Sequence, residues 1–159
     1  MIEDKKRTDI IFLDIDGVLN TNDSLRENVG ILPEKVKMLM NICSRTNASI
    51  IISSDWKYSF TLEELRKILY CAGLVDVRIL DFTGADKHMD SIRGENIETT
   101  LQSLKWGNYV ILDDLGRHHF YDHQLHNFVQ TDPEYGLRYM DVERAVKILR
   151  DRGSYEVLP

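Results

Sequence analysis

Short runs of apolar residues alternate along this chain with longer segments in which apolar positions recur every three or four residues. The runs at 10–14 and 50–52 are rich in β-branched residues and too short for helices, so we predict a buried strand at each. Further strands fit residues 76–81, 108–112 and 126–130. The runs are mostly continuous in apolar character, which is typical of strands covered on both faces of a sheet.

The segments between these strands carry the spacing and the end signals of helices. Pro33 suits a first helical turn, and apolar residues then recur at helical spacing as far as Cys43. Thr61 and Glu64 have the spacing of a capping box, and Gly73 follows as a C-cap. We predict helices over residues 33–46, 61–72, 94–104 and 140–150.

Strands that alternate with helices predict a parallel sheet with helices on both faces. We therefore expect an α/β fold of three layers, Rossmann-like, with a central parallel sheet of about five strands and a single domain over residues 1–159. In sheets of this kind the ligand binds at the carboxyl ends of the strands. The polar stretch at 20–28 could form a flap over that edge.

Composition narrows the classes of protein that fit. The 159 residues are 43% hydrophobic and 29% charged, as in an ordinary globular protein, and no apolar run approaches the roughly 20 residues that span a bilayer. The N-terminal residues are charged and lack the apolar centre of a signal peptide, so we expect a cytoplasmic protein that works without a membrane. We expect Cys43 and Cys71 to be buried free thiols, which suits a reducing compartment. The net charge of −6 argues mildly against tight binding of long nucleic acids, although it leaves room for a local basic patch.

Polar side chains follow three of the predicted strands at the point where each strand ends. Asp14 and Asp16 follow the first strand, Ser53 begins a Ser-Ser-Asp segment after the second, and Asp113-Asp114 follows the strand at 108–112. An Asp-Gly turn would explain the first pair alone, but not the agreement in position among the three ends. Carboxylates brought so close together need a cation, and hard oxygen ligands favour Mg²⁺.

These residues resemble the motifs of the haloacid dehalogenase (HAD) superfamily, most of whose members are phosphatases. The match covers about residues 10–150: Asp14-Ile-Asp16-Gly17-Val18 fits the first motif, the apolar run ending at Ser53 the second, and Ile-Leu-Asp113-Asp114 the fourth. More closely, the chain looks like the small HAD domains without a cap that are associated with bacterial RNA-repair (Swiss Army Knife) proteins. That likeness comes from Ser-Ser-Asp-Trp-Lys, Arg93-Gly94-Glu95-Asn96-Ile97 and a late Thr-Asp with Gly136-Leu137.

The resemblance implies a role for each residue at the strand ends. Asp14 would be the nucleophile that forms an aspartyl-phosphate, and Asp16 would be the general acid and base. The Ser53 hydroxyl would bind a phosphate oxygen, with Ser54 as the alternative. The cofactor would be Mg²⁺, held by the carboxylates of Asp14 and Asp113 and the backbone carbonyl of Asp16, with Asp114 in support.

The family also places a cation beside the nucleophile, before or at the start of the helix leading to the fourth strand. Arg93 is our choice because it stands directly before Gly94-Glu95, and Lys87 and Lys57 are the competitors. The residues that we expect to contact substrate are Ser54, Asn20 and Lys57. Trp56 could contact substrate or pack.

One concentration of imidazoles follows the last aspartates. Three of these histidines would share a helix face, which could hold a transition metal, but aromatic residues interrupt it and no cysteine joins. We expect the cluster to line the substrate entrance or to face solvent. Its members are His118, His119, His123 and His126.

These assignments predict a magnesium-dependent phosphatase, a phosphomonoester hydrolase that acts on an accessible phosphate of a nucleotide, another small molecule or a nucleic-acid end. Both usual cap positions are short, so we expect a minimal cap or none. The alternative is a catalytically weak HAD-like module that binds a partner protein for regulation. A receiver domain fits less well, because the pair at 113–114 does not match its order of acidic residues. A dehalogenase is disfavoured because the departure of halide needs no general acid at Asp16.

Overall fold

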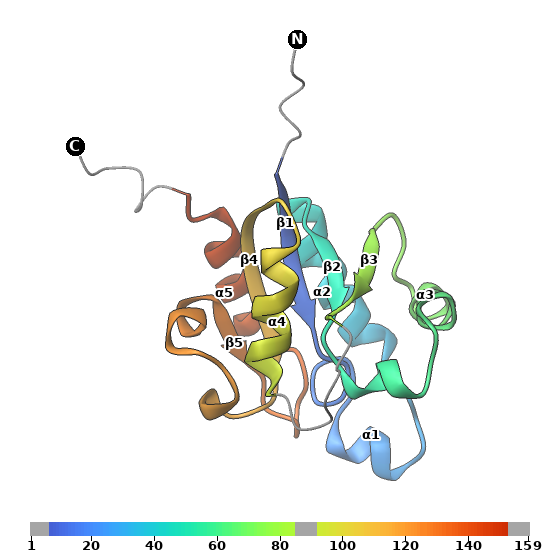
Figure 1. Ribbon diagram of the computed structural model, residues 1–159. Helices are drawn as coiled ribbons and strands as arrows, with labels where there is room; N and C mark the ends of the chain where they lie inside the picture. The colour runs from blue at the N-terminus through green and yellow to red at the C-terminus, as the bar shows by residue number, and fades with distance from the viewer. Residues whose placement is uncertain (1–6, 85–91, 153–159) are drawn as a thin grey trace, which may run out of the picture.

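The fold is built on a five-stranded sheet with the strand order β3-β2-β1-β4-β5 (Figure 1). A computed structural model describes residues 7–84 and 92–152. Every neighbouring pair of strands in the sheet runs parallel. The strands are β1 (Thr8–Leu13), β2 (Ser49–Ile52), β3 (Ile79–Phe82), β4 (Trp106–Asp113) and β5 (Phe128–Gln130). The predicted α/β class and parallel sheet are therefore confirmed.

Helices connect the strands, as parallel pairing requires. The predicted helix at 33–46 is confirmed residue for residue, and the other three predicted helices form with ends that differ by up to two residues. The α-helices are α1 (Asn22–Arg26), α2 (Pro33–Thr46), α3 (Leu62–Cys71), α4 (Arg93–Gln102) and α5 (Tyr139–Arg150). Short 3₁₀ helices cover η1 (Asp55–Tyr58), η2 (Arg117–His119) and η3 (Asp122–Asn127). No helix in the described ranges is long and apolar enough to cross a membrane.

The sheet is buried on both faces, and alternate residues of each strand divide between two cores. Ile11 and Leu13 of β1 join a core with α2, α3 and α5, whereas Ile10 and Phe12 join a second core with α4. Figure 1 shows α4 crossing one side of the sheet while α2 and α5 lie on the other. Burial on both faces explains why the strands read as continuous apolar runs and not as alternating ones.

The structure corrects several expectations about element ends. β3 begins at Ile79 and not at 76, because Asp76 has a φ of +58°, which is incompatible with an extended strand. β5 begins at Phe128 because the two residues before it belong to η3. The polar stretch at 20–28 contains the short helix α1, which Thr21 and Ser24 hold in a capping box.

The thiols also depart from expectation in one case. Cys43 is buried as expected, whereas Cys71, the last residue of α3, is exposed. The prediction of a buried thiol at Cys71 was therefore wrong, although both cysteines are free.

β3 is an edge strand, and α3 covers part of its open side. The Arg66 guanidinium donates from Nε at 3.2 Å and from Nη2 at 2.6 Å to the carbonyl of Ile79. The neighbouring carbonyl of Arg78 accepts from Ile50 of β2. Since successive carbonyls of a strand point to opposite sides, the carbonyl that Arg66 covers faces away from the sheet.

The loop that follows β5 packs onto the loop that follows β1. The Thr131 hydroxyl donates to the carbonyl of Gly17 at 2.8 Å, and the Leu137 amide donates to the carbonyl of Val18 at 2.8 Å. Gly136 has a φ of +64°, and a Cβ there would lie 3.0 Å from the carbonyl oxygens of Val18 and Asn20. This glycine therefore allows the two loops to approach closely, which fixes the backbone that follows Asp16.

We predict that Gly136→Ala lowers the free energy of unfolding by about 1–3 kcal/mol, because it adds a crowded Cβ at a left-handed backbone position. Gly30→Ala is the matched control: Gly30 has no atom within 4 Å of its Cβ position and no positive φ, so we expect no loss of stability there. Urea unfolding of both variants measures the difference. Equal midpoints for the two variants would contradict the proposed loop contact.

Candidate active site

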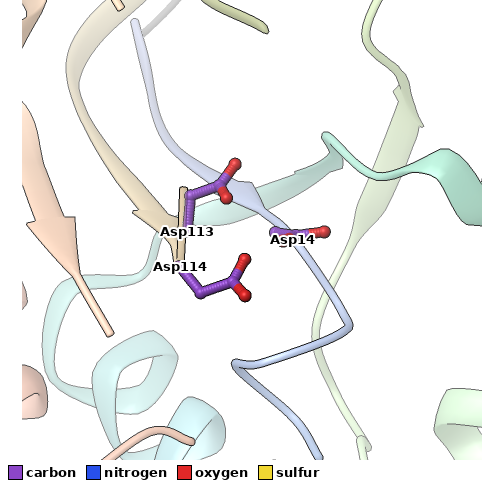
Figure 2. Close-up of side chains that lie close together, drawn as sticks. All are labelled: Asp14, Asp113 and Asp114. Atoms are coloured by element: carbon purple, nitrogen blue, oxygen red, sulfur yellow. The ribbon is translucent and has the colours of Figure 1, made fainter. Parts of the chain in front are cut away.

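Three carboxylates meet where β1 and β4 end, at the carboxyl edge of the sheet. The register pairs Leu13 with Ile52 on one side and with Leu112 on the other, so the next residue of each strand lies at the same level. As a result Asp14, Asp113 and Asp114 each offer a carboxylate oxygen within 4.8 Å of the others (Figure 2). The predicted convergence of the strand ends is therefore present for Asp14, Asp113 and Asp114, whereas the carboxylate of Asp16 lies outside the group.

Asp114 reaches this cluster because residue 17 is glycine. Gly17 has a φ of +80°, and a Cβ there would lie 2.4 Å from Oδ2 of Asp114. No real side chain could occupy that space without moving the carboxylate. Gly17 thus allows the left-handed turn of the loop and also leaves room for the carboxylate of Asp114.

The two buried aspartates, Asp14 and Asp113, each accept a hydrogen bond from a backbone amide. Asp14 is 5% exposed, and its Oδ1 accepts from the amide of Ile15 at 2.8 Å. Asp113 is fully buried, and its Oδ1 accepts from the amide of Leu115 at 3.0 Å. These bonds restrict the rotation of both side chains.

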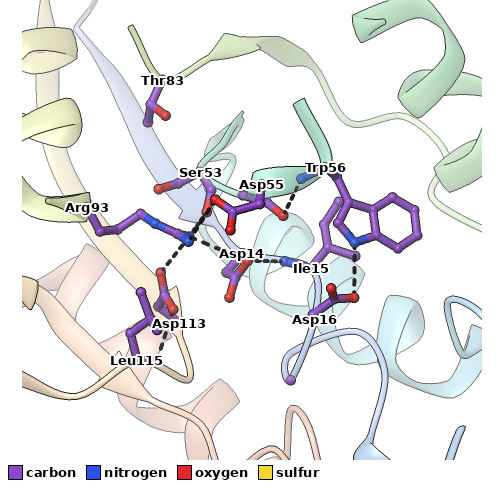
Figure 3. Close-up of polar contacts among 12 residues, drawn as sticks. Asp14, Ile15, Asp16, Ser53, Asp55, Trp56, Thr83, Arg93, Asp113 and Leu115 are labelled. Atoms are coloured by element: carbon purple, nitrogen blue, oxygen red, sulfur yellow. Dashed lines mark hydrogen bonds and ion pairs between the residues drawn. The ribbon is translucent and has the colours of Figure 1, made fainter. Parts of the chain in front are cut away.

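Arg93, the first residue of α4, lies against this cluster. Its Nη1 donates to Asp113 Oδ2 at 3.1 Å and lies 3.5 Å from Asp14 Oδ1. The same nitrogen donates to the carbonyl of Ser53, and Nη2 lies 3.6 Å from Asp55 Oδ1 (Figure 3). The structure therefore places the predicted cation beside the predicted nucleophile. The competing Lys87 lies outside the described residues.

Negative charge exceeds positive charge inside the cluster. Burial and the nearby Asp113 raise the pKa of Asp14 well above its usual value, although Arg93 opposes them. Burial also raises the pKa of Asp113 to about 6, against the lowering effects of Arg93 and the Leu115 amide. Burial lowers the pKa of Arg93, but the carboxylates of Asp113, Asp14 and Asp55 outweigh it, so that pKa is raised. One guanidinium does not neutralise this cluster, and a divalent cation would relieve the remaining repulsion.

The segment after β2 provides the polar side chains opposite Asp113. Ser53 is fully buried, and its hydroxyl has no hydrogen-bond partner among the described residues. A buried hydroxyl without a partner costs free energy unless a ligand or a water satisfies it. Ser54, the predicted alternative, instead accepts from the amide of Trp56 at 3.2 Å and caps η1. The geometry thus favours Ser53 over Ser54 for binding a ligand.

Asp16 lies apart from the carboxylate cluster. It is exposed, and its Oδ1 accepts from Asn20 Nδ2 at 2.8 Å and from Trp56 Nε1 at 3.0 Å (Figure 3). Its carboxylate is therefore not among the grouped metal ligands, which is consistent with a predicted metal contact through its backbone carbonyl only. Asn20, which we predicted to contact substrate, is fully buried with both ends of its amide engaged. We therefore correct its role from substrate contact to support of the loop.

Lys57 belongs to η1, and its side chain reaches the end of β3. Its Nζ is 3.5 Å from the hydroxyl of Thr83, a buried residue directly after that strand. The ammonium group thus reaches the carboxyl edge of the sheet, and its predicted contact with substrate stays a prediction. Sequence reasoning missed Thr83, because nothing in the local pattern distinguishes it from an ordinary loop threonine.

The histidines do not form a metal site. Within the described ranges, the three grouped aspartates are the one set of three or more potential ligands close enough to share an ion. His118 and His119 lie in η2 with ring centroids 4.2 Å apart, and His123 in η3 is 2.9 Å from Glu98 Oε2. The predicted shared helix face does not form, because 3₁₀ turns replace a continuous α-helix.

Gln124 is a supporting residue that sequence reasoning missed. It is fully buried, and its Nε2 donates to the carbonyl of Gly94 at 2.9 Å. A Cβ at Gly94 would lie 2.5 Å from Gln124 Oε1, so glycine is required for this approach. The contact fixes the first turn of α4, which carries Arg93.

A comparison with protein families supports the same interpretation. Residues 10–142 match the model of a family described as the HAD domain in Swiss Army Knife RNA repair proteins. The chain belongs to this family. No curated protein and no solved structure gave a match. The predicted HAD domain is thus confirmed, and the carboxylate cluster lies at the strand ends where its first and fourth motifs were expected.

We predict that Arg93→Gln lowers the free energy of unfolding by on the order of 3 kcal/mol in the metal-free protein, because it leaves buried carboxylates without their cation. Adding Asp113→Asn to this variant should recover part of the loss, since it removes one of those charges. Urea unfolding of the single and double variants measures both effects.

The control is Arg26→Gln, which breaks an exposed pair with Asp23 and should leave stability unchanged. A loss at Arg93 no larger than at Arg26 would show that the buried cluster does not depend on the guanidinium.

Proposed function

We propose that this HAD domain is a magnesium-dependent phosphomonoesterase that works through an aspartyl-phosphate on Asp14. The observation that carries the proposal is the pairing of two unmet needs at one place. The three carboxylates lack enough positive charge to balance them. The buried hydroxyl of Ser53, whose carbonyl accepts from the same arginine that contacts Asp14 and Asp113, has no hydrogen-bond partner among the described residues. Magnesium together with a phosphate group would satisfy both.

The donor set fits Mg²⁺. Asp14, Asp113 and Asp114 would hold the ion, with the backbone carbonyl of Asp16 as the predicted fourth protein ligand. Oxygen ligands at a site without histidine or cysteine favour Mg²⁺ over transition metals. When bound, the ion would draw negative charge away from the phosphate group, so that a carboxylate nucleophile could approach it.

Two displacements at phosphorus would complete the reaction. In the first, an oxygen of Asp14 forms a bond to phosphorus while the bond to the leaving oxygen breaks, and Asp16 gives that oxygen its proton. In the second, Asp16 removes a proton from water, the water oxygen bonds to phosphorus, and the bond to Asp14 breaks. The products are the alcohol and inorganic phosphate, and both aspartates return to their starting states.

Arg93 and Ser53 would bind the phosphate group in both steps. Arg93 already lies between Asp14 and Asp113, so its guanidinium reduces the repulsion that an incoming phosphate would meet. The buried Ser53 hydroxyl would donate to a phosphate oxygen. Lys57, at the neighbouring strand end, would contact the part of the substrate beyond the phosphate.

An accessible phosphate suits this site. The insertion after β1 folds only the short helix α1, and residues 83–92 separate β3 from α4, so neither is long enough for a cap domain. The family description names RNA repair proteins. Both points favour the phosphate of a nucleic-acid end or a nucleotide as the substrate.

The thiols bear on where the domain would work. Burial raises the pKa of the Cys43 thiol to about 12, so this group is inert, but Cys71 is exposed and free. An exposed thiol stays reduced most readily in a reducing compartment, and we propose the cytoplasm.

We predict that the protein releases phosphate from p-nitrophenyl phosphate in the presence of Mg²⁺, and that Asp14→Asn abolishes this release because an amide is a poor nucleophile. Asp81→Asn is the matched control, since Asp81 lies near the end of β3 but outside the cluster. Parallel assays with mononucleotides and with 3′- or 5′-phosphorylated oligonucleotides identify the substrate class. An Asp14→Asn protein as active as the wild type would refute the proposed nucleophile.

We predict that Mg²⁺ raises the melting temperature of the wild type, because the ion binds only the folded cluster. Asp113→Asn should remove this rise without lowering the melting temperature of the metal-free protein, since burial makes the charge of Asp113 unfavourable. Asp81→Asn should keep the rise. Thermal unfolding with Mg²⁺ and with a chelator measures all three proteins, and an unchanged rise in Asp113→Asn would remove Asp113 from the proposed metal ligands.

A further inference from the structure

Asp16 is held through one of its two carboxylate oxygens. Asn20 Nδ2 and Trp56 Nε1 both donate to Oδ1, at 2.8 and 3.0 Å. An exposed aspartate without such donors would sample several rotamers, since solvent satisfies it equally well in each. Two donors from different segments, one after β1 and one after β2, select a single orientation.

The orientation of Asn20 is itself fixed. Its Oδ1 accepts from the amide of Gly17 at 2.8 Å, which identifies the opposite end of the side chain as the NH₂ group that faces Asp16. Asn20 is also fully buried, so it cannot turn toward solvent. It thus donates to Asp16 from a rigid position within the same loop.

Trp56 approaches from the other side, and three contacts hold it. Its amide donates to the hydroxyl of Ser54, its carbonyl accepts from the amide of Phe60 at 3.0 Å, and its ring stacks on Phe60 with 5.2 Å between centroids. Figure 3 shows the indole N–H pointing at the Asp16 carboxylate. The tryptophan therefore does more than fill space, because its one polar atom is directed at the predicted acid.

We propose that Trp56, together with Asn20, is a positioning residue for Asp16 that reserves Oδ2 for proton transfer. An oxygen that accepts two N–H bonds is a poor place for a proton, so the proton of the acid form resides on the other oxygen. The pair thus presents Oδ2 to the leaving oxygen of the substrate, and afterwards to the attacking water. This inference rests on the proposed function, in which Asp16 is the general acid and base.

A positioning role for Trp56 predicts that the loss of rate on removing its N–H depends on the leaving group of the substrate. A poor leaving group such as an alkoxide needs its proton during bond breaking, whereas p-nitrophenolate leaves with little help. Trp56→Phe keeps a smaller aromatic ring beside Phe60 and removes the N–H, and the same loss of ring size at Trp106 serves as the control. A purely structural role would change the rates of both kinds of substrate alike.

The first test measures kcat/KM for an alkyl phosphate and for p-nitrophenyl phosphate. For each substrate kcat/KM reports the first displacement, in which the leaving group departs. We expect Trp56→Phe to lower kcat/KM about tenfold for the alkyl phosphate and less than about twofold for the aryl phosphate, the size of effect expected from losing one orienting hydrogen bond. Trp106→Phe, the same change at an indole that donates to the Leu101 carbonyl, should leave both values unchanged. Equal losses on both substrates, or none, would overturn the proposal.

The second test examines the contact without relying on activity. The chain has 2 tryptophans, so the proton–nitrogen NMR spectrum should show two indole N–H signals, which Trp106→Phe assigns. Asp16→Ala should shift the Trp56 signal and speed its exchange with solvent, while the Trp106 signal stays in place. An unmoved Trp56 signal would overturn the proposal whatever the activity. A moved signal in a protein that hydrolyses no phosphate ester would instead refute the proposed function, and the acid role of Asp16 with it.

Discussion

Asp14 and Asp113 lie buried within reach of a single guanidinium group, and this concentration of negative charge governs the surrounding structure. Each carboxylate would be costly to bury alone, and the pair is costly even with Arg93 beside it. Hydrogen bonds from the neighbouring backbone offset part of that free-energy cost. Amides of Ile15 and Leu115 point at the carboxylates, and α4 begins at Arg93 so that its side chain reaches the cluster. A site that remains electrostatically unfavourable on its own is well suited to bind a cation tightly.

The segment directly after β2 orients several parts of the site at once. The Ser53 hydroxyl is buried without a partner among the described residues, the Ser53 carbonyl accepts from Arg93, and Ser54 caps the turn that follows. Asp55 then lies near the guanidinium, and Trp56 donates to Asp16. The tight turn of the short 3₁₀ helix η1 directs the consecutive side chains of Asp55 and Trp56 toward different partners.

The sheet and the strand-end aspartates could be predicted from the sequence because both depend on local pattern. Apolar runs identify the strands, parallel pairing aligns their ends, and Asp14 and Asp113 therefore meet without knowledge of any other contact. Arg93 could be chosen from the family resemblance, which expects a cation before or at the start of the helix leading to β4, and α4 begins at Arg93. The roles of Asn20 and Trp56 could not, because they depend on side-chain directions across a loop and a 3₁₀ turn. The start of β3 was missed for a similar reason, as the left-handed backbone at Asp76 leaves no mark on hydrophobic periodicity.

The guanidinium of Arg66 occupies a backbone carbonyl on the exposed edge strand β3. A sheet edge with free carbonyls and amides is a template on which another extended chain can add. Here the outward carbonyl of Ile79 is already bonded within the molecule, and Asp81 places an exposed carboxylate on the same short strand. An incoming chain would have to displace a charged donor and approach a negative charge to gain very few hydrogen bonds. The β3 edge of this sheet is therefore a poor template for an added strand.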